Sequence, residues 1–515
     1  MKNKAVSIIV KVLLALITPL AVCLIYCLVR GVSLSDLYLP SSYNNDCVFY
    51  YKLVDAIVSK GGPTGYFGFN ESHALYGGFA AWSPLIVLPW VLWGVAFGWS
   101  YSSVFVCNIV IFSLAFAAFV YLSDIDFKEL GVLAVLLLLF PSFSIHLLNV
   151  LPEIILASVA LIYMGFAART AIREIKISYI VAMFITAAYL AMVRPYMILL
   201  MILPAYYLGK KIKKIWAFVT FVAVAAVSVA ANFIIGHFFT SAYFDPLFKT
   251  DIITTILKGR FSEGFWMAVY MFRSMLQGIG TAVKDAFAYG LTMGIGYVVA
   301  LVTALLVLVF SFKKGEHKLR PVYLSFFVTV ATVLVAIVFL LQKTNEGGRH
   351  IWIFAFLGII ICCLSGFKVQ GIVMKAVVLV LLVFFAIRGS MVPTDYDIPI
   401  AQDGAKENVE YWSGVFGDGK NVAQEAQGYD NTVIWVFVDY TADSSVVTEY
   451  NELYALPAGT GISCCYPDYV MNNFESLQSR YIITDSRGNV AGLCKDKGLE
   501  VIAEHGNVVM FRRAN

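Results

Sequence analysis

Charged residues are scarce in this chain. Asp, Glu, Lys and Arg make up 14% of its 515 residues, whereas 60% are hydrophobic and the mean hydropathy is +0.80. A soluble domain does not need that much apolar surface, which excludes a soluble protein. Many stretches approach the length of about 20 apolar residues that crosses a bilayer. The chain is therefore predicted to be a polytopic α-helical membrane protein.

Other familiar signals are also missing. No glycine-rich phosphate loop, internal repeat, low-complexity tract or heptad run occurs in the chain. The net charge is only +4, and membrane proteins keep Lys and Arg in their cytoplasmic loops, so no nucleic-acid partner is expected. The missing phosphate loop is consistent with a substrate that is carried by a lipid.

The nine cysteines show no spacing typical of a metal site. Five of them lie in apolar stretches and are predicted to be ordinary core residues. Cys464, Cys465 and Cys494 fall in the polar C-terminal part. An extracytoplasmic position would permit one disulfide among these three, but their odd number leaves the pairing open.

The chain opens with Lys2 and Lys4, followed by an apolar run at 5–28. This run is longer than the apolar core of about 7–15 residues in a signal peptide, and no small-x-small cleavage site follows it. We therefore predict an uncleaved first span with its lysines inside. In all, about 11–13 transmembrane helices are expected. The candidate spans are 7–29, 80–98, 102–122, 131–147, 153–168, 178–193, 196–208, 215–236, 286–311, 321–341, 351–366 and 371–389.

Basic clusters orient these spans, because loops rich in Lys and Arg stay in the cytoplasm. The clusters at 169–176, 210–214 and 313–320 are predicted to lie inside. The loops 237–285 and 342–350 then lie outside.

The number of predicted passes disagrees with the side of the membrane predicted for the C-terminus. Twelve complete passes would return the C-terminus to the cytoplasm, whereas the basic loops place residues 391–515 outside. One apolar segment between 79 and 130 is therefore predicted to be half-inserted or to lie in the membrane plane. Pro84 and Pro89 fit this exception, since irregular backbone at membrane depth is tolerated only against protein or a wet cavity. We expect a multi-pass protein of the cell membrane with a cytoplasmic N-terminus and an extracytoplasmic C-terminal domain.

Two parts are predicted along the chain. Residues 1–390 form the transmembrane part, whose outer loop 30–79 carries interfacial helices and whose outer loop 237–285 carries a surface helix at 261–276. Residues 391–515 are polar and mixed, and about 125 residues suffice for a small α/β domain. Strands are expected there at 433–438, 480–484, 500–503 and 508–512.

Asp46 stands near the start of the first outer loop, just before an amphipathic helix predicted at 47–59. One explanation is structural, because a carboxylate in this position caps the following helix. The other is chemical, because the outer mouth of a helical bundle suits chemistry on a lipid-carried substrate. The two roles are compatible, since a helix start holds a carboxylate rigidly.

Glu153 and Arg194 are two further charges at the ends of apolar spans. Pro152 and Glu153 suit the first turn of a helix, but an acid beside hydrocarbon is costly and usually functional. Arg194, followed by Pro195, lies between two short spans on the face predicted for Asp46. Snorkelling to the interface also explains this arginine.

Gly347 and Gly348 precede Arg349 and His350 where a later span begins on the outer side. Glycines allow close approach of the backbone to a ligand, and an arginine grips phosphate through two parallel hydrogen bonds. Arg273 is a further candidate for contact with a lipid phosphate.

A metal site is a separate hypothesis. His73, late in the first loop, could join Asp46 and Glu153 as a metal ligand, although a lone loop histidine is more often solvated. His146 and His237 lie near the ends of spans and are predicted to be structural or interfacial.

Together these features resemble the GT-C superfamily of integral-membrane glycosyltransferases, in particular bacterial aminoarabinose transferases and protein O-mannosyltransferases. The resemblance rests on Asp46, Trp82-Ser83-Pro84-Leu85, Leu151-Pro152-Glu153, Arg194-Pro195, Gly348-Arg349-His350 and the soluble C-terminal part. The chain departs from the family at Asp46-Cys47, where members have an Asp-Glu pair, and it lacks a Glu-Lys pair before Pro84.

The resemblance implies a GT-C-like fold and transfer of a sugar from a polyprenyl-phosphate carrier to a lipid, glycan or protein acceptor on the outer face. Asp46 is the implied general base, and Glu153 orients the acceptor or supports Asp46. The implied contacts to the donor phosphate are Arg194, Arg349, His350 and Arg273. A divalent cation (Mg²⁺, Mn²⁺ or Zn²⁺) is the only cofactor considered.

Two other functions stay open at this stage. A transporter or flippase of a lipid-linked or amphipathic solute should contain paired broken helices in two related halves. The short spans on either side of Arg194 fit that pattern, but the second half has no matching pair. Alternatively, residues 391–515 bind a partner and the chain is a scaffold or receptor. Convergence of Asp46 with Glu153 would count against both.

Overall fold

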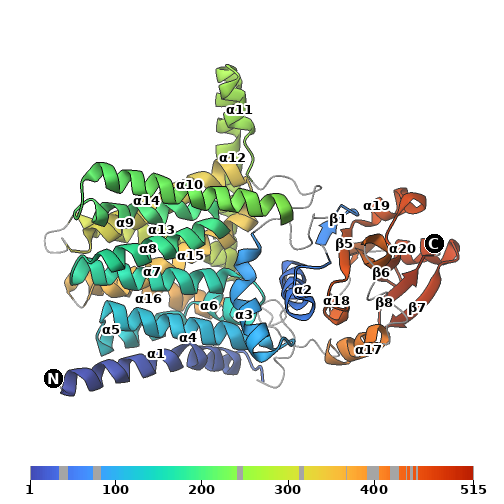
Figure 1. The fold of residues 1–515 in the computed structure, drawn as a ribbon, viewed down its shortest axis with the longest axis horizontal. Helices are drawn as coiled ribbons and strands as arrows, with labels where there is room; N and C mark the ends of the chain where they lie inside the picture. The colour runs from blue at the N-terminus through green and yellow to red at the C-terminus, as the bar shows by residue number, and fades with distance from the viewer. Residues whose placement is uncertain are drawn as a thin grey trace.

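The computed structural model shows a bundle of apolar helices with a small sheet domain at one end (Figure 1). This confirms the predicted class, a polytopic α-helical membrane protein with a small C-terminal α/β part. The N-terminus lies at the end of the bundle away from the sheet domain (Figure 1). The structure describes residues 2–33, 45–65, 67–72, 83–239, 248–290, 292–312, 318–366, 368–390, 405–417, 428–436, 438–440, 445–447 and 451–513.

Within these ranges, eight helices are long and apolar enough to cross a membrane. Their hydropathy made them predictable, because each is close to the thickness of the hydrocarbon core. They are α1 (Lys2–Val29), α4 (Ser103–Ser123), α7 (Glu153–Ile172), α10 (Lys214–Phe239), α13 (Thr292–Ser311), α14 (Arg320–Ala336) with its continuation η4 (Ile337–Leu341), α15 (Thr344–Leu364) and α16 (Val369–Gly389).

The remaining apolar segments are shorter or bent. Helices α5 (Phe127–Leu138) and α6 (Pro141–Leu148) meet at a bend of 75°, where Pro141 cannot continue the hydrogen bonding of α5. The short segments are η2 (Pro84–Val87) with α3 (Leu88–Phe97), α8 (Ile177–Val193), and η3 (Pro195–Met201) with α9 (Ile202–Leu208). Counting these segments brings the number into the predicted range. Helix α3 crosses the end of the bundle instead of running along it (Figure 1).

Three helices lie outside this set, namely α2 (Asn45–Lys60), α11 (Asp251–Leu257) and α12 (Phe261–Tyr289). Helix α12 is longer than the predicted surface helix 261–276, and the span predicted at 286–311 begins only at Thr292. The break is at Gly290, whose φ of +73° suits glycine. A Cβ there would also lie 2.6 Å from the Gly389 amide nitrogen. Because residues 286–289 are largely apolar, the sequence did not reveal this helix boundary.

The C-terminal part forms a six-stranded sheet of order β1-β5-β2-β6-β8-β7. The pairings among β1, β5, β2 and β6 are parallel, and β8 pairs antiparallel with both β6 and β7. The strands are β1 (Phe67–Phe69), β2 (Thr432–Val436), β5 (Gly461–Cys465), β6 (Tyr481–Asp485), β7 (Glu500–His505) and β8 (Val508–Arg512), with a separate pair β3 (Val438–Tyr440) and β4 (Ser445–Val447). The helices are α17 (Ala405–Gly417), α18 (Asn451–Ala455), α19 (Pro467–Asn472) and α20 (Asn489–Asp496).

Strand β1 comes from the loop between α1 and α3, 395 positions before its partner β5 in the register Phe67 to Ile462. The sheet is therefore built from both ends of the chain. Cys464, Cys465 and Cys494 are buried free thiols, so the disulfide considered for this part does not form.

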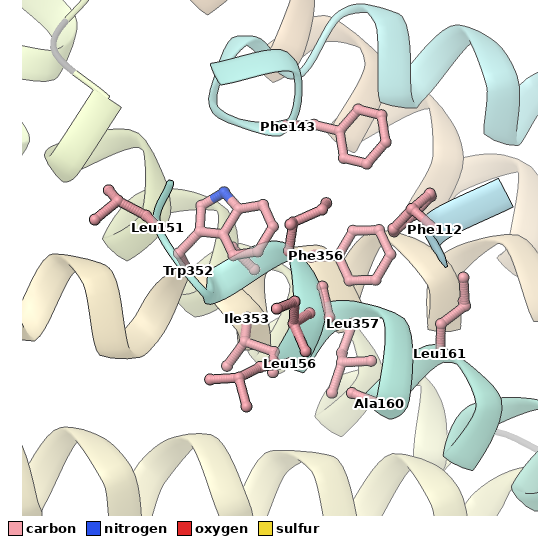
Figure 2. Packing of buried hydrophobic residues seen from close by; sticks show 14 of the residues in the cluster. Phe112, Phe143, Leu151, Leu156, Ala160, Leu161, Trp352, Ile353, Phe356 and Leu357 are labelled. Atoms are coloured by element: carbon pink, nitrogen blue, oxygen red, sulfur yellow. The ribbon is translucent and has the colours of Figure 1, made fainter. Parts of the chain in front are cut away.

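A continuous apolar core joins the bundle to the sheet domain through α2. Phe49 of α2 packs edge-on against Trp435 of β2, with ring centroids 6.5 Å apart. Deeper in the bundle, Phe112, Phe143 and Phe356 bring α4, α6 and α15 together (Figure 2), with centroids 4.9 Å apart for Phe112 and Phe143. This packing forms a continuous apolar interior in this part of the bundle.

Candidate active site

Asp46 lies in the first turn of α2, at the junction of the bundle and the sheet domain. Its Oδ2 accepts a hydrogen bond from Nη1 of Arg349 at 2.6 Å. Arg349 belongs to the beginning of α15, 303 positions later in the chain. The side chains of Asp46 and Arg349 are 14% and 20% exposed, so this pair is the accessible part of the site.

Glu153 lies behind this pair, in the first turn of α7. Its Oε1 accepts hydrogen bonds from Nη2 of Arg194 at 2.6 Å and from Nε of Arg349 at 3.3 Å. Glu153 and Arg194 are each 1% exposed. Arg349 therefore connects the accessible carboxylate of Asp46 to a fully buried ion pair.

Arg194 extends the network to the aromatic rings of Tyr196 and His350. It stands between α8 and η3, where Pro195 ends the regular helix. Its Nη1 donates to the Tyr196 hydroxyl at 3.3 Å, and that hydroxyl is 2.6 Å from Nδ1 of His350. The structure thus brings together five of the residues selected from the sequence, Asp46, Glu153, Arg194, Arg349 and His350.

The network forms where several spans begin or break at the same end of the bundle. Helix α7 begins after Pro152, α8 stops before Pro195, and α15 starts with a close approach at Gly347. A Cβ on Gly347 would lie 2.2 Å from the Tyr297 hydroxyl and 2.7 Å from Ile337. Only glycine lets α15 begin so near α13 and η4, which sets the height of Arg349.

The network balances two carboxylates against two guanidinium groups. Burial of ion pairs costs desolvation energy that attraction alone need not recover. Glu153 Oε2 and Arg349 Nη2 are also buried and, within the described part of the chain, have no hydrogen-bond partner. Buried polar atoms are normally paired, so these two atoms are exceptions within the network.

His146, for which the sequence favoured a structural or interfacial role, lies near this network. It lies in the last turn of α6, buried, with its ring 4.2 Å from that of Trp352 of α15, and it is near enough to interact electrostatically with Glu153. Figure 2 shows Trp352 within the same apolar cluster as Phe143 and Phe356. His146 Nδ1 and Trp352 Nε1 also have no partner among the residues described. In the sequence, the one signal that could have pointed to His146 was its ring partner Trp352, three positions after Arg349.

Two neighbours on α2 stay protonated. Burial raises the pKa of the Cys47 thiol to about 12, and the adjacent Asp46 carboxylate adds to the effect. Burial also raises the pKa of the Tyr50 phenol well above its usual range. Asp46 is therefore the group on this turn of α2 that offers a negative charge.

Helix α2 is fixed against the sheet domain by polar contacts as well as by its apolar face. Lys52 donates to Asp55 at 2.6 Å and to the carbonyl of Leu456. Farther along the loop, the Glu71 carboxylate accepts from the backbone N–H groups of Gln478 at 3.0 Å and Ser479 at 2.6 Å. These contacts set the position of Asp46 from the far side.

Other residues selected from the sequence are not joined to this network. His73 and Trp82 lie outside the described residues. Arg273 is exposed on α12 and takes no part in the hydrogen bonds of the Arg349 network. Its role as a phosphate contact stays a prediction.

The metal hypothesis meets a difficulty in the donor set. The Arg349 guanidinium binds both Asp46 and Glu153, so a positive group already occupies the position that a shared cation would take. In the described ranges, no group of three His, Cys, Asp or Glu residues is arranged to hold a metal ion. The described side chains do not fit a divalent cation in this arrangement.

Comparison with known proteins gives structural matches only; no family model and no curated protein matches the sequence. An oligosaccharyltransferase from Archaeoglobus fulgidus, in complex with Zn and sulfate, matches at a TM-score of 0.48 and 12% identity over 91% of this chain and 68% of that one. AglB from the same organism, in complex with an inhibitory peptide and a dolichol-phosphate, matches at 0.46 and 11% over 94% and 72%. ArnT from Cupriavidus metallidurans, bound to undecaprenyl phosphate, matches at 0.45 and 12% over 97% of both chains.

These proteins are membrane glycosyltransferases of the superfamily that the sequence resembles. Because all three TM-scores lie below 0.5, we argue function from the site of this chain alone.

Proposed function

We propose that this chain is a glycosyltransferase that moves a sugar from a polyprenyl-phosphate-linked donor to an acceptor on the outer face of the membrane. One observation carries the proposal: Asp46 and Glu153, from distant parts of the chain, share Arg349 at the end of the bundle beneath the sheet domain. Convergence of these carboxylates counts against a transporter, whose site should lie near the middle of the membrane, and against a scaffold.

Asp46 is the proposed general base. It is more exposed than Glu153, so an acceptor hydroxyl can approach it within the hydrogen-bond distance that proton transfer requires. Glu153 is too deeply buried for direct transfer and holds Arg349 and Arg194 in place. Its role is to position the cations around the reacting groups.

Arg349 is the proposed main contact to the donor phosphate. Its Nη2 has no partner among the described residues, while Nη1 is bonded to Asp46. A phosphate that binds the guanidinium through two hydrogen bonds competes with Asp46 for Nη1. Donor binding thereby releases the Asp46 carboxylate from its ion pair and makes it a stronger base at the moment when the donor is present.

The transfer step then balances as follows. Asp46 takes the proton of the acceptor hydroxyl, and the acceptor oxygen forms a bond to the anomeric carbon. The bond from that carbon to the phosphate oxygen breaks, and its electron pair leaves with the lipid phosphate. Arg349 stabilises the negative charge that develops on the phosphate, while Arg194, Tyr196 and His350 hold this side of the site in place.

Replacement of Asp46 by Asn tests the proposal. Loss of a general base lowers transfer by about 10²–10⁴-fold, measured with purified protein and a polyprenyl-phosphate-linked sugar. Asp251→Asn is the control, because it removes the same charge from an exposed residue of α11 that takes no part in the network. Full transfer activity in Asp46→Asn would overturn the assignment of the base.

A further inference from the structure

Two grooves flank helix α9 at the end of the bundle opposite the candidate active site (Figure 1). The first, of about 580 Å³, lies between α9 and α14 and includes Leu324 and Val328. The second, of about 550 Å³, lies between α9 and α10 and includes Phe218. Ile202 and Tyr206 of α9 line both, so the two grooves lie on either side of one short helix.

The grooves follow from the shortness of this span. Segments η3 and α9 together cover Pro195–Leu208, whereas the neighbouring α10 has 26 residues and the α14 span has 22. A shorter span between longer ones leaves a recess that faces the hydrocarbon, and its walls are chiefly apolar. Each recess has a volume within the range of about 300–1,000 Å³ that is typical of small-molecule sites.

Cationic side chains stand at the mouths of both grooves. Arg320 lines the first, and Lys210 and Lys214 line the second. The Lys210 ammonium lies 4.6 Å from the centre of the Tyr206 ring. Among the residues that the structure describes, no acidic one lines either groove. An apolar recess with a positive rim matches a molecule that has hydrocarbon chains and a negative head.

We propose that an anionic phospholipid straddles α9, with one acyl chain in each groove and its phosphate between Arg320 and the Lys210–Lys214 pair. Basic pockets between transmembrane helices bind anionic headgroups in this way. The site is separate from that of the proposed sugar donor, because Arg194 precedes η3 whereas Lys210 follows α9, at the opposite end of the same segment. The lipid fills the recess and fastens α9 between α10 and α14.

Native mass spectrometry of the full chain in detergent, titrated with phosphatidylglycerol or with phosphatidylcholine, tests this site. The wild type should retain phosphatidylglycerol more strongly. A variant with Lys210→Gln, Lys214→Gln and Arg320→Gln should bind phosphatidylglycerol at least about tenfold more weakly, with binding of phosphatidylcholine unchanged.

The matched control carries Lys128→Gln, Lys176→Gln and Lys368→Gln, which remove the same charge from exposed residues at the same end of the bundle. An equal loss in both triple variants would show general attraction and overturn the site. A second variant, Val328→Trp, fills the first groove without a change of charge and should also weaken phosphatidylglycerol binding. Unchanged binding in Val328→Trp would contradict the placement of an acyl chain there. None of these measurements depends on sugar transfer, so their failure leaves the proposed function untouched.

Discussion

Asp124 and Glu153 each receive two cations from other helices, at opposite ends of the bundle. Asp124, directly after α4, accepts from Lys11 of α1 at 3.2 Å and from Arg173 at the end of α7 at 2.5 Å. Glu153 accepts from Arg194 at 2.6 Å and from Arg349 at 3.3 Å. The geometry is alike, but the Arg173 side chain is 52% exposed and that of Arg194 only 1%.

The difference in burial decides what each cluster does. Water reaches Asp124 and Arg173, where an ion pair contributes little beyond helix-to-helix contact. Glu153 and Arg194 have lost their hydration, so breaking that pair leaves an uncompensated charge. A bundle stabilised only for packing would favour apolar residues at Glu153 and Arg194. The proposed function accounts for their presence, whereas Asp124 needs no such explanation.

The largest expected effect is that of Glu153→Gln. The substitution keeps the shape of the side chain but leaves the buried Arg194 and the partly exposed Arg349 with one carboxylate fewer. We expect the free energy of unfolding to fall by about 3–5 kcal/mol, measured by thermal or denaturant unfolding in detergent. A loss below about 1 kcal/mol would remove the contrast with Asp124.

Arg349→Lys should have the next largest effect. The ammonium keeps the charge but cannot bind Asp46, Glu153 and a phosphate at once through a planar fork. Misplacement of this contact should lower transfer by about 10²-fold, with a higher KM for the donor. Arg173→Lys is the control at the exposed cluster, and comparable losses in both variants would contradict a direct contact between Arg349 and substrate.

Tyr196→Phe should have a smaller effect. It removes the hydroxyl that joins Arg194 to His350 and should lower the free energy of unfolding by about 1 kcal/mol. His350→Phe, measured with it in a double-mutant cycle, should give less than the sum of the two single effects. Strict additivity would show that the two rings act independently.

Asp124→Asn should have the smallest effect, about 0–1 kcal/mol. Partial burial alone would raise the pKa of Asp124, but the bonds from Lys11 and Arg173 outweigh it and hold the pKa below its ordinary value of 3.8. Its contribution to stability is therefore present above that value and is lost as the pH falls through the lower pKa of the folded state. Acid unfolding curves of wild type and Asp124→Asn should converge below about pH 4; a constant difference down to pH 2 would contradict this ion pair.

Much of the bundle follows from the sequence, because hydropathy reports membrane spans directly. The selection of Asp46, Glu153, Arg194 and Arg349 depended on a second regularity. Glu153, Arg194 and Arg349 are charges at the ends of spans, where hydrocarbon leaves few reasons for a charge. Asp46 begins a loop helix on the same predicted face. Residues on the same face and at the same membrane depth are confined to a small region, so their convergence could be anticipated.

Features that depend on packing could not be anticipated. His146 is one histidine on a short buried helix, and only the bend between α5 and α6 brings it to Trp352. Strand β1 has three residues, too few for a period-2 pattern, and β5 ends in Ser463-Cys464-Cys465 without β-branched residues there. Both strands exist because neighbouring strands complete their hydrogen bonding, which is information held elsewhere in the chain.

The pairing of β1 with β5 has a consequence for how the protein is made. The ribosome produces Phe67 long before Ile462, and Glu71 long before Ser479, the residues that they contact. During synthesis α2 emerges without the surface against which it packs, and Asp46 acquires its setting only when the last strands have been made. A nascent chain that stalls before residue 461 therefore carries every member of the Arg349 network but lacks β5, the strand that pairs with β1 beside α2.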